Sequence, residues 1–293
     1  LKTVICRNTR SGEEFELEAA AAVLAVGHSA RDTFRMLHES GVAMEPRDFA
    51  VGVRVEHLAG SISLAQYGRF AKFLPAADYK LVSHAHERTV FTFCMCPGGV
   101  VIPAASERGG VVVNGMSDFA RDGANSNSAL MVQLSRADFG GGLFDGMEFQ
   151  RRLERAAFAA GGGDYRAPCQ RFGDFLRDRP SDSFGSVRPT YAAGVNFAPL
   201  SQVLPAVAVS ALKAAVPDMA RRLHGFDDAD ALLTGVESRF SSPVRILRGA
   251  DRQSVTVKNL YPCGEGSGYS GGITSSAADG IRTAEYLYEL HKI

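Results

Sequence analysis

The sequence of 293 residues has no excess of charge of either sign, because 32 lysines and arginines balance 32 aspartates and glutamates. This balance argues against nucleic acid or an anionic membrane as the main partner, although it leaves room for a local basic patch. No apolar run approaches the ~20 residues that a membrane-spanning helix needs. The composition therefore predicts a soluble globular protein that is long enough for two domains.

Cysteines are few, and their number is odd. The five are widely scattered: Cys6, Cys94, Cys96, Cys169 and Cys263. They do not predict a disulfide framework, and a reducing cytoplasm is the location that we expect. Residues 1–10 have no long apolar core, so they do not read as a signal peptide. Because the chain begins with Leu1 rather than Met, we expect that its natural protein has further residues upstream.

The N-terminal part predicts a β-hairpin within residues 1–18 and then a strand–turn–helix unit. The apolar run 19–26 is typical of a strand buried on both faces, and Gly27 ends it. Ser29 is a suitable N-cap for the helix that follows, and Gly41 is placed to stop that helix. Such a unit is the building block of α/β folds.

The middle of the chain has a different pattern. Residues 49–57 alternate with period two, residues 79–117 predict an antiparallel meander, and helices are expected within 144–163 and 200–216. Residues 164–199 are rich in Pro, Gly and Asp and predict a segment that wraps the surface. We therefore expect an α/β protein with an inserted α+β domain.

Residues 261–280 form a glycine-rich loop that matches two unrelated motifs. Gly268, Ser270 and Gly272 spell the G-x-S-x-G of a hydrolase elbow, which needs its acid and its histidine on later strands. Asp279 is the one aspartate and His291 the one histidine that follow, and both fall on one predicted helix. This arrangement disfavours a hydrolase.

The same loop contains the G-x-G-x-x-G of a dinucleotide-binding turn at Gly266, Gly268 and Gly271. That fingerprint needs a second strand ending in an acidic residue ~20 residues further on, whereas the chain stops within the helix. A third interpretation is a loop that closes a flavin site, since glycines allow a flat ring to approach the backbone. The helix start near Gly272 and Ile273 would stabilise negative charge on a reduced flavin.

Several long stretches resemble a known family, among them "AVLAVGHSARDTF", "FQRRLERAAFAAGGGDYRAPCQRFGDFL" and "LYPCGEGSGYSGGITSSAADGIRTAE". The sequence is similar to the bacterial FAD-dependent dehydrogenases, often described as NAD(P)/FAD-dependent oxidoreductases. The resemblance implies a flavoprotein with two dinucleotide-binding domains and a discontinuous, Rossmann-like FAD domain. That domain would comprise residues 1–42 and 244–293, with residues 43–243 as the inserted substrate domain.

The resemblance also implies a function and partners. The cofactor would be FAD, and hydride would pass between flavin and an unidentified small-molecule substrate, with NAD(P)H as a candidate. Family members carry an upstream region with the G-x-G-x-x-G that binds the ADP part of FAD, so the N-terminal half of the flavoprotein is an expected partner. Nucleic acid and membranes are not expected as partners. The alternative is a non-catalytic fragment or interaction domain that needs this half to bind FAD.

Two sets of residues are the candidate cofactor contacts. One follows the first predicted strand, where a simple helix cap is the competing interpretation, and the other is the glycine loop, where a tight turn without ligand competes. Glu265 would accept hydrogen bonds from hydroxyls of the cofactor. The candidates are Gly27, His28, Ser29, Arg31, Gly264, Glu265, Gly266, Tyr269, Gly271, Gly272 and Ile273.

Other candidates have ordinary structural explanations, and no catalytic residue can be assigned. Cys94 and Cys96 would share one strand face as redox thiols or as buried structural cysteines. His84 and His86 also share a face, but no third ligand is evident, so we expect no metal site.

Three further polar residues, Arg54, Glu56 and His57, lie on or beside a predicted strand. They could line a substrate cleft. An exposed strand face explains them equally well.

Overall fold

The computed structural model describes residues 1–84 and 87–291, and the chain divides into two compact units. Unit 1 comprises Leu1–Phe49, Ser135–Met147 and Phe240–Ile293, and unit 2 comprises Ala50–Leu134 and Glu148–Arg239. Unit 1 is therefore discontinuous in sequence. The division from the sequence into FAD-domain segments 1–42 and 244–293 and an inserted domain 43–243 stays a prediction.

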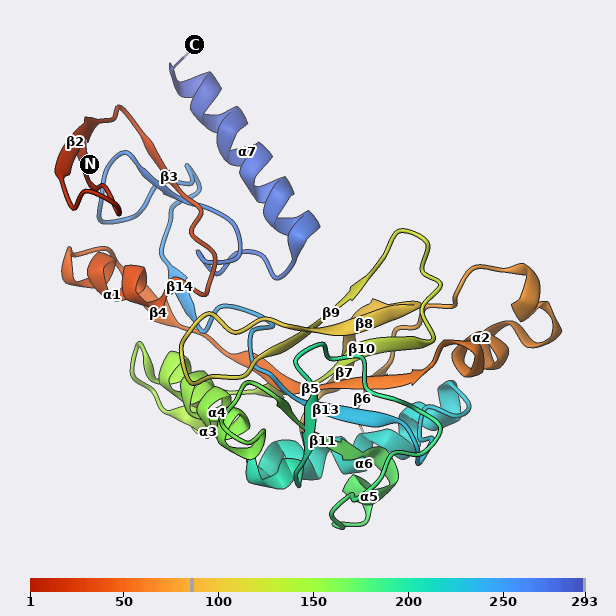
Figure 1. Cartoon of the computed structure of the whole chain (residues 1–293). Helices are drawn as coiled ribbons and strands as arrows, with labels where there is room; N and C mark the ends of the chain where they lie inside the picture. Colours follow the sequence, from red (N-terminus) through yellow and green to blue (C-terminus); the bar gives the residue numbers. More distant parts are fainter. Residues whose placement is uncertain (85–86, 292–293) are drawn as a thin grey trace. The chain divides into compact units, whose positions relative to one another are not determined.

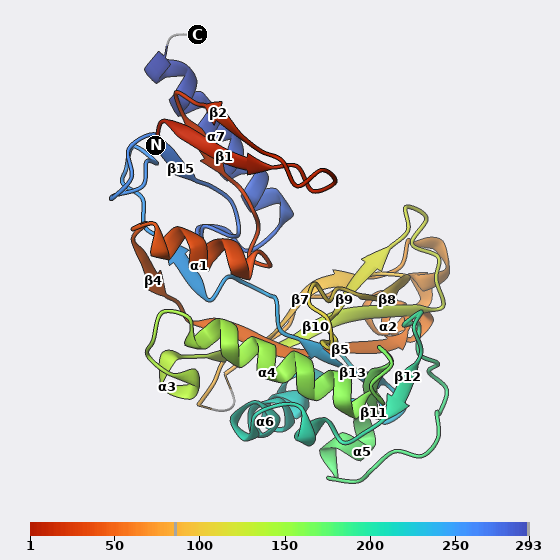
Figure 2. The same cartoon turned by 60° about the vertical axis from the view of Figure 1, so that its left-hand side comes forward.

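Unit 1 is built from three pairs of short strands and three helices (Figure 2). The antiparallel pairs are β1 (Thr3–Arg7) with β2 (Glu14–Glu18) and β4 (Met44–Pro46) with β14 (Val244–Ile246). The parallel pair is β3 (Ala22–Leu24) with β15 (Leu260–Pro262). The helices are α1 (Arg31–Glu39), α3 (Arg136–Phe139) and α7 (Ile273–His291).

The core of unit 1 joins segments that are far apart in the sequence. Phe34 and Leu37 lie one turn apart on the buried side of α1. They pack with five other buried residues, namely Val42, Met147, Val244, Ile246 and Leu260. The helix ends as expected at Gly41, which has φ +84°. Its N-cap is Ala30 rather than the expected Ser29, and no side chain caps it.

The expectation for residues 19–26 is wrong in its burial. Only Ala22–Leu24 forms a strand, and Val23 and Val26 are 49% and 41% exposed. The reason is that β3 pairs only with β15 in the described chain, so its sheet is two strands wide. An apolar run shows that a strand can be buried, whereas its neighbours decide whether it is.

Unit 2 contains a mixed seven-stranded sheet with the order β12-β11-β13-β5-β10-β7-β6. The pairs β10–β7, β11–β13, β13–β5 and β6–β7 are antiparallel, whereas β11 runs parallel to β12. In chain order its strands are β5 (Phe49–Leu58), β6 (Val82–Ser83), β7 (Val90–Cys96), β10 (Asn125–Leu134), β11 (Ala167–Arg171), β12 (Val195–Phe197) and β13 (Leu232–Glu237). A separate hairpin pairs β8 (Gly99–Pro103) with β9 (Val113–Ser117). The chain is thus a mixed α/β protein, as expected.

The helices of unit 2 include the two that the sequence predicts. The helices of this unit are α2 (Ala59–Tyr67), η1 (Gly68–Phe73), α4 (Asp145–Ala160, whose first three residues belong to unit 1), α5 (Phe172–Leu176), η2 (Leu200–Gln202) and α6 (Ala206–Arg222). Pro205 is the N-cap of α6, a position that suits its missing N–H. Figure 1 shows α5 and α6 on one side of the large sheet and the β8–β9 hairpin on the other.

Residues 164–199 do not simply wrap the surface as expected. They supply β11, which lies between β12 and β13, and four of its five residues are buried. No described helix is both long enough and apolar enough to cross a bilayer.

Candidate functional site

The two predicted ligand-binding loops begin at the ends of neighbouring parallel strands. β3 and β15 run side by side, and beyond their ends the Cys263 N–H donates to the Leu24 carbonyl at 2.9 Å. Each strand leads through a glycine with positive φ, Gly27 at +70° and Gly264 at +76°, towards a helix. The carboxyl ends of parallel strands are the place where α/β proteins bind ligands.

The loops touch each other directly. A Cβ on Gly266 would lie 2.5 Å from the Gly27 carbonyl oxygen, so only glycine fits there. Beside this contact, His28 Nδ1 pairs with a carboxylate oxygen of Glu265. The structure thus brings together four of the residues predicted from the sequence, two from each loop.

The ring of His28 has an unused polar atom. His28 is only 7% exposed, and its buried Nε2 has no hydrogen-bond partner among the described residues. If the Glu265 carboxylate accepts the Nδ1 proton, Nε2 is left as a hydrogen-bond acceptor. A buried acceptor without a donor is unfavourable, and an N–H or O–H group of a bound molecule would relieve the cost.

The glycine loop has a buried inner half and an open outer half. Gly264, Gly266 and Gly268 are buried. At Gly268 the φ is +80°, and a Cβ would lie 2.9 Å from the Val244 carbonyl oxygen. These three glycines therefore serve the turn and its packing.

The outer half offers surface to a ligand. Tyr269 is 37% exposed, Ile273 is 92% exposed, and Gly271 has open space where a Cβ would be. Of the other candidates, Gly272 is half-buried, Ser29 is exposed, and Arg31 is buried at the first position of α1.

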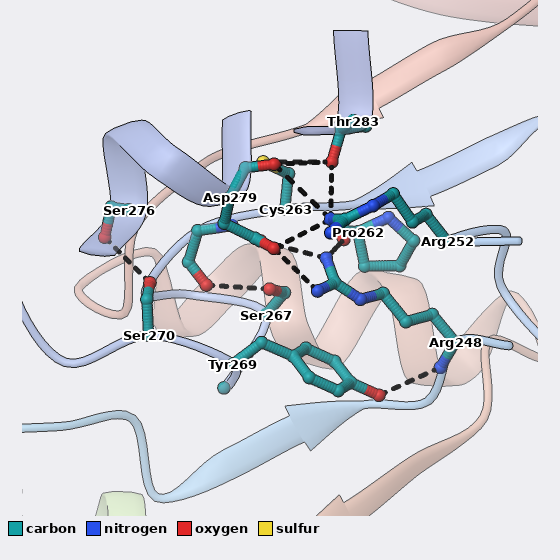
Figure 3. Close-up of polar contacts among 12 residues, drawn as sticks. Arg248, Arg252, Pro262, Cys263, Ser267, Tyr269, Ser270, Ser276, Asp279 and Thr283 are labelled. Carbon is teal, nitrogen blue, oxygen red and sulfur yellow. Dashed lines mark hydrogen bonds and ion pairs between the residues drawn. The ribbon is translucent and has the colours of Figure 1, made fainter. Parts of the chain in front are cut away.

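Asp279 fixes the loop from within α7 (Figure 3). Its carboxylate accepts hydrogen bonds from both terminal nitrogens of Arg248 at 2.7 and 2.9 Å and from Arg252 Nη1 at 2.8 Å. It also accepts the Gly264 N–H at 2.9 Å. Burial alone would raise the pKa of Asp279, but these hydrogen bonds outweigh it and hold the pKa well below its usual value.

Arg248 also positions Tyr269. The Arg248 N–H donates to the Tyr269 hydroxyl at 3.1 Å, and its guanidinium lies 4.0 Å from the ring centroid. Ser267 and Ser270 add hydrogen bonds of 2.7 Å to the Gly264 carbonyl and 2.8 Å to the Ser276 hydroxyl. The loop is therefore held in one shape by contacts within its own unit.

Sequence reasoning missed the role of Asp279, Arg248 and Arg252. Gly280, directly after Asp279, is a poor helix former, yet α7 continues through both residues. An acidic residue at a poor helix position near a glycine loop is the one signal that pointed to this anchor.

The interpretation of Arg54 and Glu56 as an exposed strand face is wrong, because both are fully buried. The Arg54 guanidinium makes two bonds to Glu237, at 2.5 and 3.0 Å, and donates to Asn114 at 2.7 Å and Asn127 at 3.1 Å. A further bond of 2.8 Å reaches the Cys94 carbonyl. Since Asn114 belongs to β9, the β8–β9 hairpin covers the face of β5 that the alternating pattern predicts to be exposed.

Glu56 and His57 are also interior groups. Glu56 Oε1 accepts bonds from Asn125 Nδ2 at 3.1 Å and from the Thr190 N–H and hydroxyl at 3.2 and 2.5 Å. Its Oε2 is buried and has no hydrogen-bond partner in the part of the chain that the structure describes, and burial raises the pKa of the carboxyl. His57 Nε2 bonds to the Phe226 carbonyl at 2.9 Å, and burial lowers the pKa of the imidazole.

The two cysteines of β7 differ in their surroundings. The pairing of β7 with β10 shifts register at Asn127, and Cys94 has φ +42°, so the regular alternation breaks there. Cys94 is exposed, whereas Cys96 is buried, and burial raises the pKa of the Cys96 thiol.

His84 bonds to Thr89 at 3.2 Å, and His86 lies outside the described residues. Within the described ranges, no three His, Cys, Asp or Glu residues are grouped to hold a metal ion.

Comparison with known proteins identifies the family. Residues 48–240 match the model of a family described as "FAD-dependent protein, C-terminal domain-like". The chain belongs to this family. It is also 50% identical over 274 residues to an uncharacterised protein of Clostridium beijerinckii. The aligned residues cover 92% of this chain and 51% of that protein. The chain thus spans about half the length of this relative.

Membership of an FAD-dependent family confirms the resemblance at that level. The matched residues 48–240 comprise all of unit 2. Both loops, residues 27–31 and 264–273, lie outside this match, so their assignment depends on the geometry of unit 1.

Proposed function

We propose that this chain is part of an FAD-dependent oxidoreductase and that two of its loops, residues 27–31 and 264–273, contact the cofactor. The observation that carries the proposal is the contact of the loops at the ends of β3 and β15. There His28 is held by Glu265, and its other ring nitrogen is buried with no partner within residues 1–84 and 87–291. Membership of the FAD-dependent family supports the choice of cofactor.

Different residues would make different contacts with the cofactor. The Glu265 carboxylate and His28 Nε2 would accept hydrogen bonds from hydroxyl or N–H groups of the cofactor. The open backbone from Tyr269 to Gly272 would allow a flat ring to approach, and the start of α7 would favour negative charge on it. Bound FAD would supply hydride chemistry, while this chain supplies position and electrostatics.

The exposed apolar surface of unit 1 supports a further protein segment as a partner. Large apolar side chains are exposed on two of the three strand pairs and on both longer helices: Ile5, Phe15, Leu17, Val23, Met36, Ile281, Tyr288 and Leu290. So many large apolar side chains exposed on one small unit favour an interface with another segment. We propose that an N-terminal half of the flavoprotein covers it, in keeping with the greater length of the relative.

The same surface favours the second candidate function. In it, the chain is a non-catalytic interaction domain that binds FAD only together with that half. The substrate would be a small molecule, with NAD(P)H as a candidate second substrate.

FAD content tests the cofactor assignment. The protein with its natural upstream sequence is purified as wild type, His28→Ala and Glu265→Gln, and bound flavin is measured by its absorbance near 450 nm after desalting. We expect both variants to retain less FAD than wild type. Glu14→Gln, which changes a surface ion pair with Arg7, is the matched control. Wild-type protein that stays colourless after reconstitution with FAD would refute the proposal.

A further inference from the structure

The segment of residues 59–77 forms a projection at the edge of unit 2, which we call the α2–η1 hairpin (Figure 1). Four of its large apolar side chains are open to solvent: Leu64 by 62%, Phe70 by 53%, Phe73 by 73% and Leu74 by 46%. Single exposed apolar residues are normal on a protein surface, whereas a cluster usually marks a binding surface.

The base of this hairpin is firmly held. Ile62 is 1% exposed, and the Ala59 N–H donates to the Ala124 carbonyl at 2.9 Å. The returning segment is fixed by the Ala77 N–H, which donates to the Ser63 hydroxyl at 3.2 Å. A further bond of 3.0 Å joins Gln66 to the Asp78 carbonyl. These contacts at the base display the apolar tip in a defined shape.

The charge of the hairpin has one sign. Residues 59–77 contain Arg69 and Lys72 and no aspartate or glutamate. The Arg69 guanidinium lies 4.9 Å from the Phe70 ring centroid, and the Lys72 ammonium lies 4.8 Å from that of Phe73. Each exposed ring therefore carries a cation beside it, although the whole chain has no net charge.

The apolar surface continues beyond the hairpin. Pro75 lines a hollow of about 620 Å³ together with Met95, Pro97 and Phe119. Phe119 is fully exposed on the loop after β9, and the hollow is also lined by one cation, Arg121, and one acidic residue, Asp118.

We propose that the α2–η1 hairpin binds the surface of an anionic lipid membrane, with the Phe70 and Phe73 rings in the headgroup layer and Arg69 and Lys72 on the lipid phosphates. Aromatic rings beside basic groups are typical of segments that lie at a membrane interface. Basic residues near such a surface are attracted by anionic lipids. This is the local basic patch that the neutral composition leaves room for, and the proposal departs from the expectation that no membrane is a partner.

The lack of tryptophan makes a direct test possible, because Phe73→Trp would supply the sole tryptophan of the chain. The purified protein is titrated with phosphatidylcholine vesicles with or without phosphatidylglycerol, and the emission maximum is recorded. We expect a blue shift with the anionic vesicles and little change with the neutral ones. Tyr165→Trp is the control, because Tyr165 is also part-exposed but packs on Phe158 after α4. Its emission should not shift.

A charge variant tests the electrostatic part. One basic residue near an anionic surface changes binding about fivefold, so Arg69→Gln with Lys72→Gln should weaken vesicle binding about 25-fold. The double variant Phe70→Ser with Phe73→Ser, followed by cosedimentation, should bind neither vesicle.

Three outcomes would overturn the proposal. They are the absence of a shift with anionic vesicles, an equal shift with neutral vesicles, and a shift that appears without lipid when protein concentration is raised. The last would assign the hairpin to a protein–protein contact.

Discussion

Replacement of Asp279 by alanine tests whether one carboxylate holds the glycine loop to α7. The change removes the acceptor of four hydrogen bonds. It also leaves the guanidinium groups of Arg248 and Arg252 without their carboxylate partner, although these side chains are only 8% and 18% exposed. Loss of one partner of a buried ion pair costs about 3–5 kcal/mol. Because Arg252 keeps some contact with solvent, we expect a loss near the lower limit, about 3 kcal/mol.

The more conservative Asp279→Asn separates charge from shape. The amide keeps one oxygen acceptor but loses the charge, and hydrogen bonds to charged groups contribute about 1.5–3 kcal/mol, so we expect a loss of about 2 kcal/mol. Urea unfolding followed by circular dichroism gives the free energies, and hydrogen exchange at Gly264 reports the loop itself. Glu285→Ala, at an exposed position on the same helix, is the control and should change the free energy of unfolding by less than about 0.5 kcal/mol. If Asp279→Ala matches this control, the anchor role is refuted.

The pH dependence of this effect has a definite sign. The pKa of Asp279 lies below its unfolded value, so its stabilisation is complete above the unfolded pKa, about 3.9, and disappears as pH falls towards the folded value. The difference in unfolding free energy between wild type and Asp279→Ala should therefore be constant near neutral pH and shrink below about pH 4.

Two further predictions concern groups that are buried. Glu56→Gln should stabilise the protein at neutral and alkaline pH, because burial raises the pKa of Glu56 in the folded state. The stability of the wild type therefore falls as pH rises from the unfolded pKa towards the folded one. Thermal melts of both proteins across pH check this, and parallel curves of melting temperature against pH would contradict it. Gly266→Ala should destabilise by about 1–3 kcal/mol, since its Cβ would meet backbone at 2.5 Å, whereas Gly271→Ala should be nearly neutral because its Cβ would meet nothing within 4 Å. Equal unfolding midpoints for these two variants would show that the loops do not pack as described.

Much of the local structure follows from the sequence alone. Periodicity predicts α1, α4 and α6, and Gly41 stops α1 because it can adopt positive φ. Alternation predicts β5, since side chains two residues apart share a face of a strand. The glycine loop before α7 is also evident, because glycine patterns, strand and helix all occur within one short stretch.

Only the tertiary structure decides what covers each face and which distant groups meet. Alternation could not show that a hairpin buries Arg54 on the second face of β5, nor that the apolar run around Val23 stays half open. His28 and Glu265 lie 237 residues apart and meet only because β3 and β15 pair in parallel. Sequence pattern reports the geometry of a single element, whereas burial and pairing depend on neighbours that long-range packing brings together.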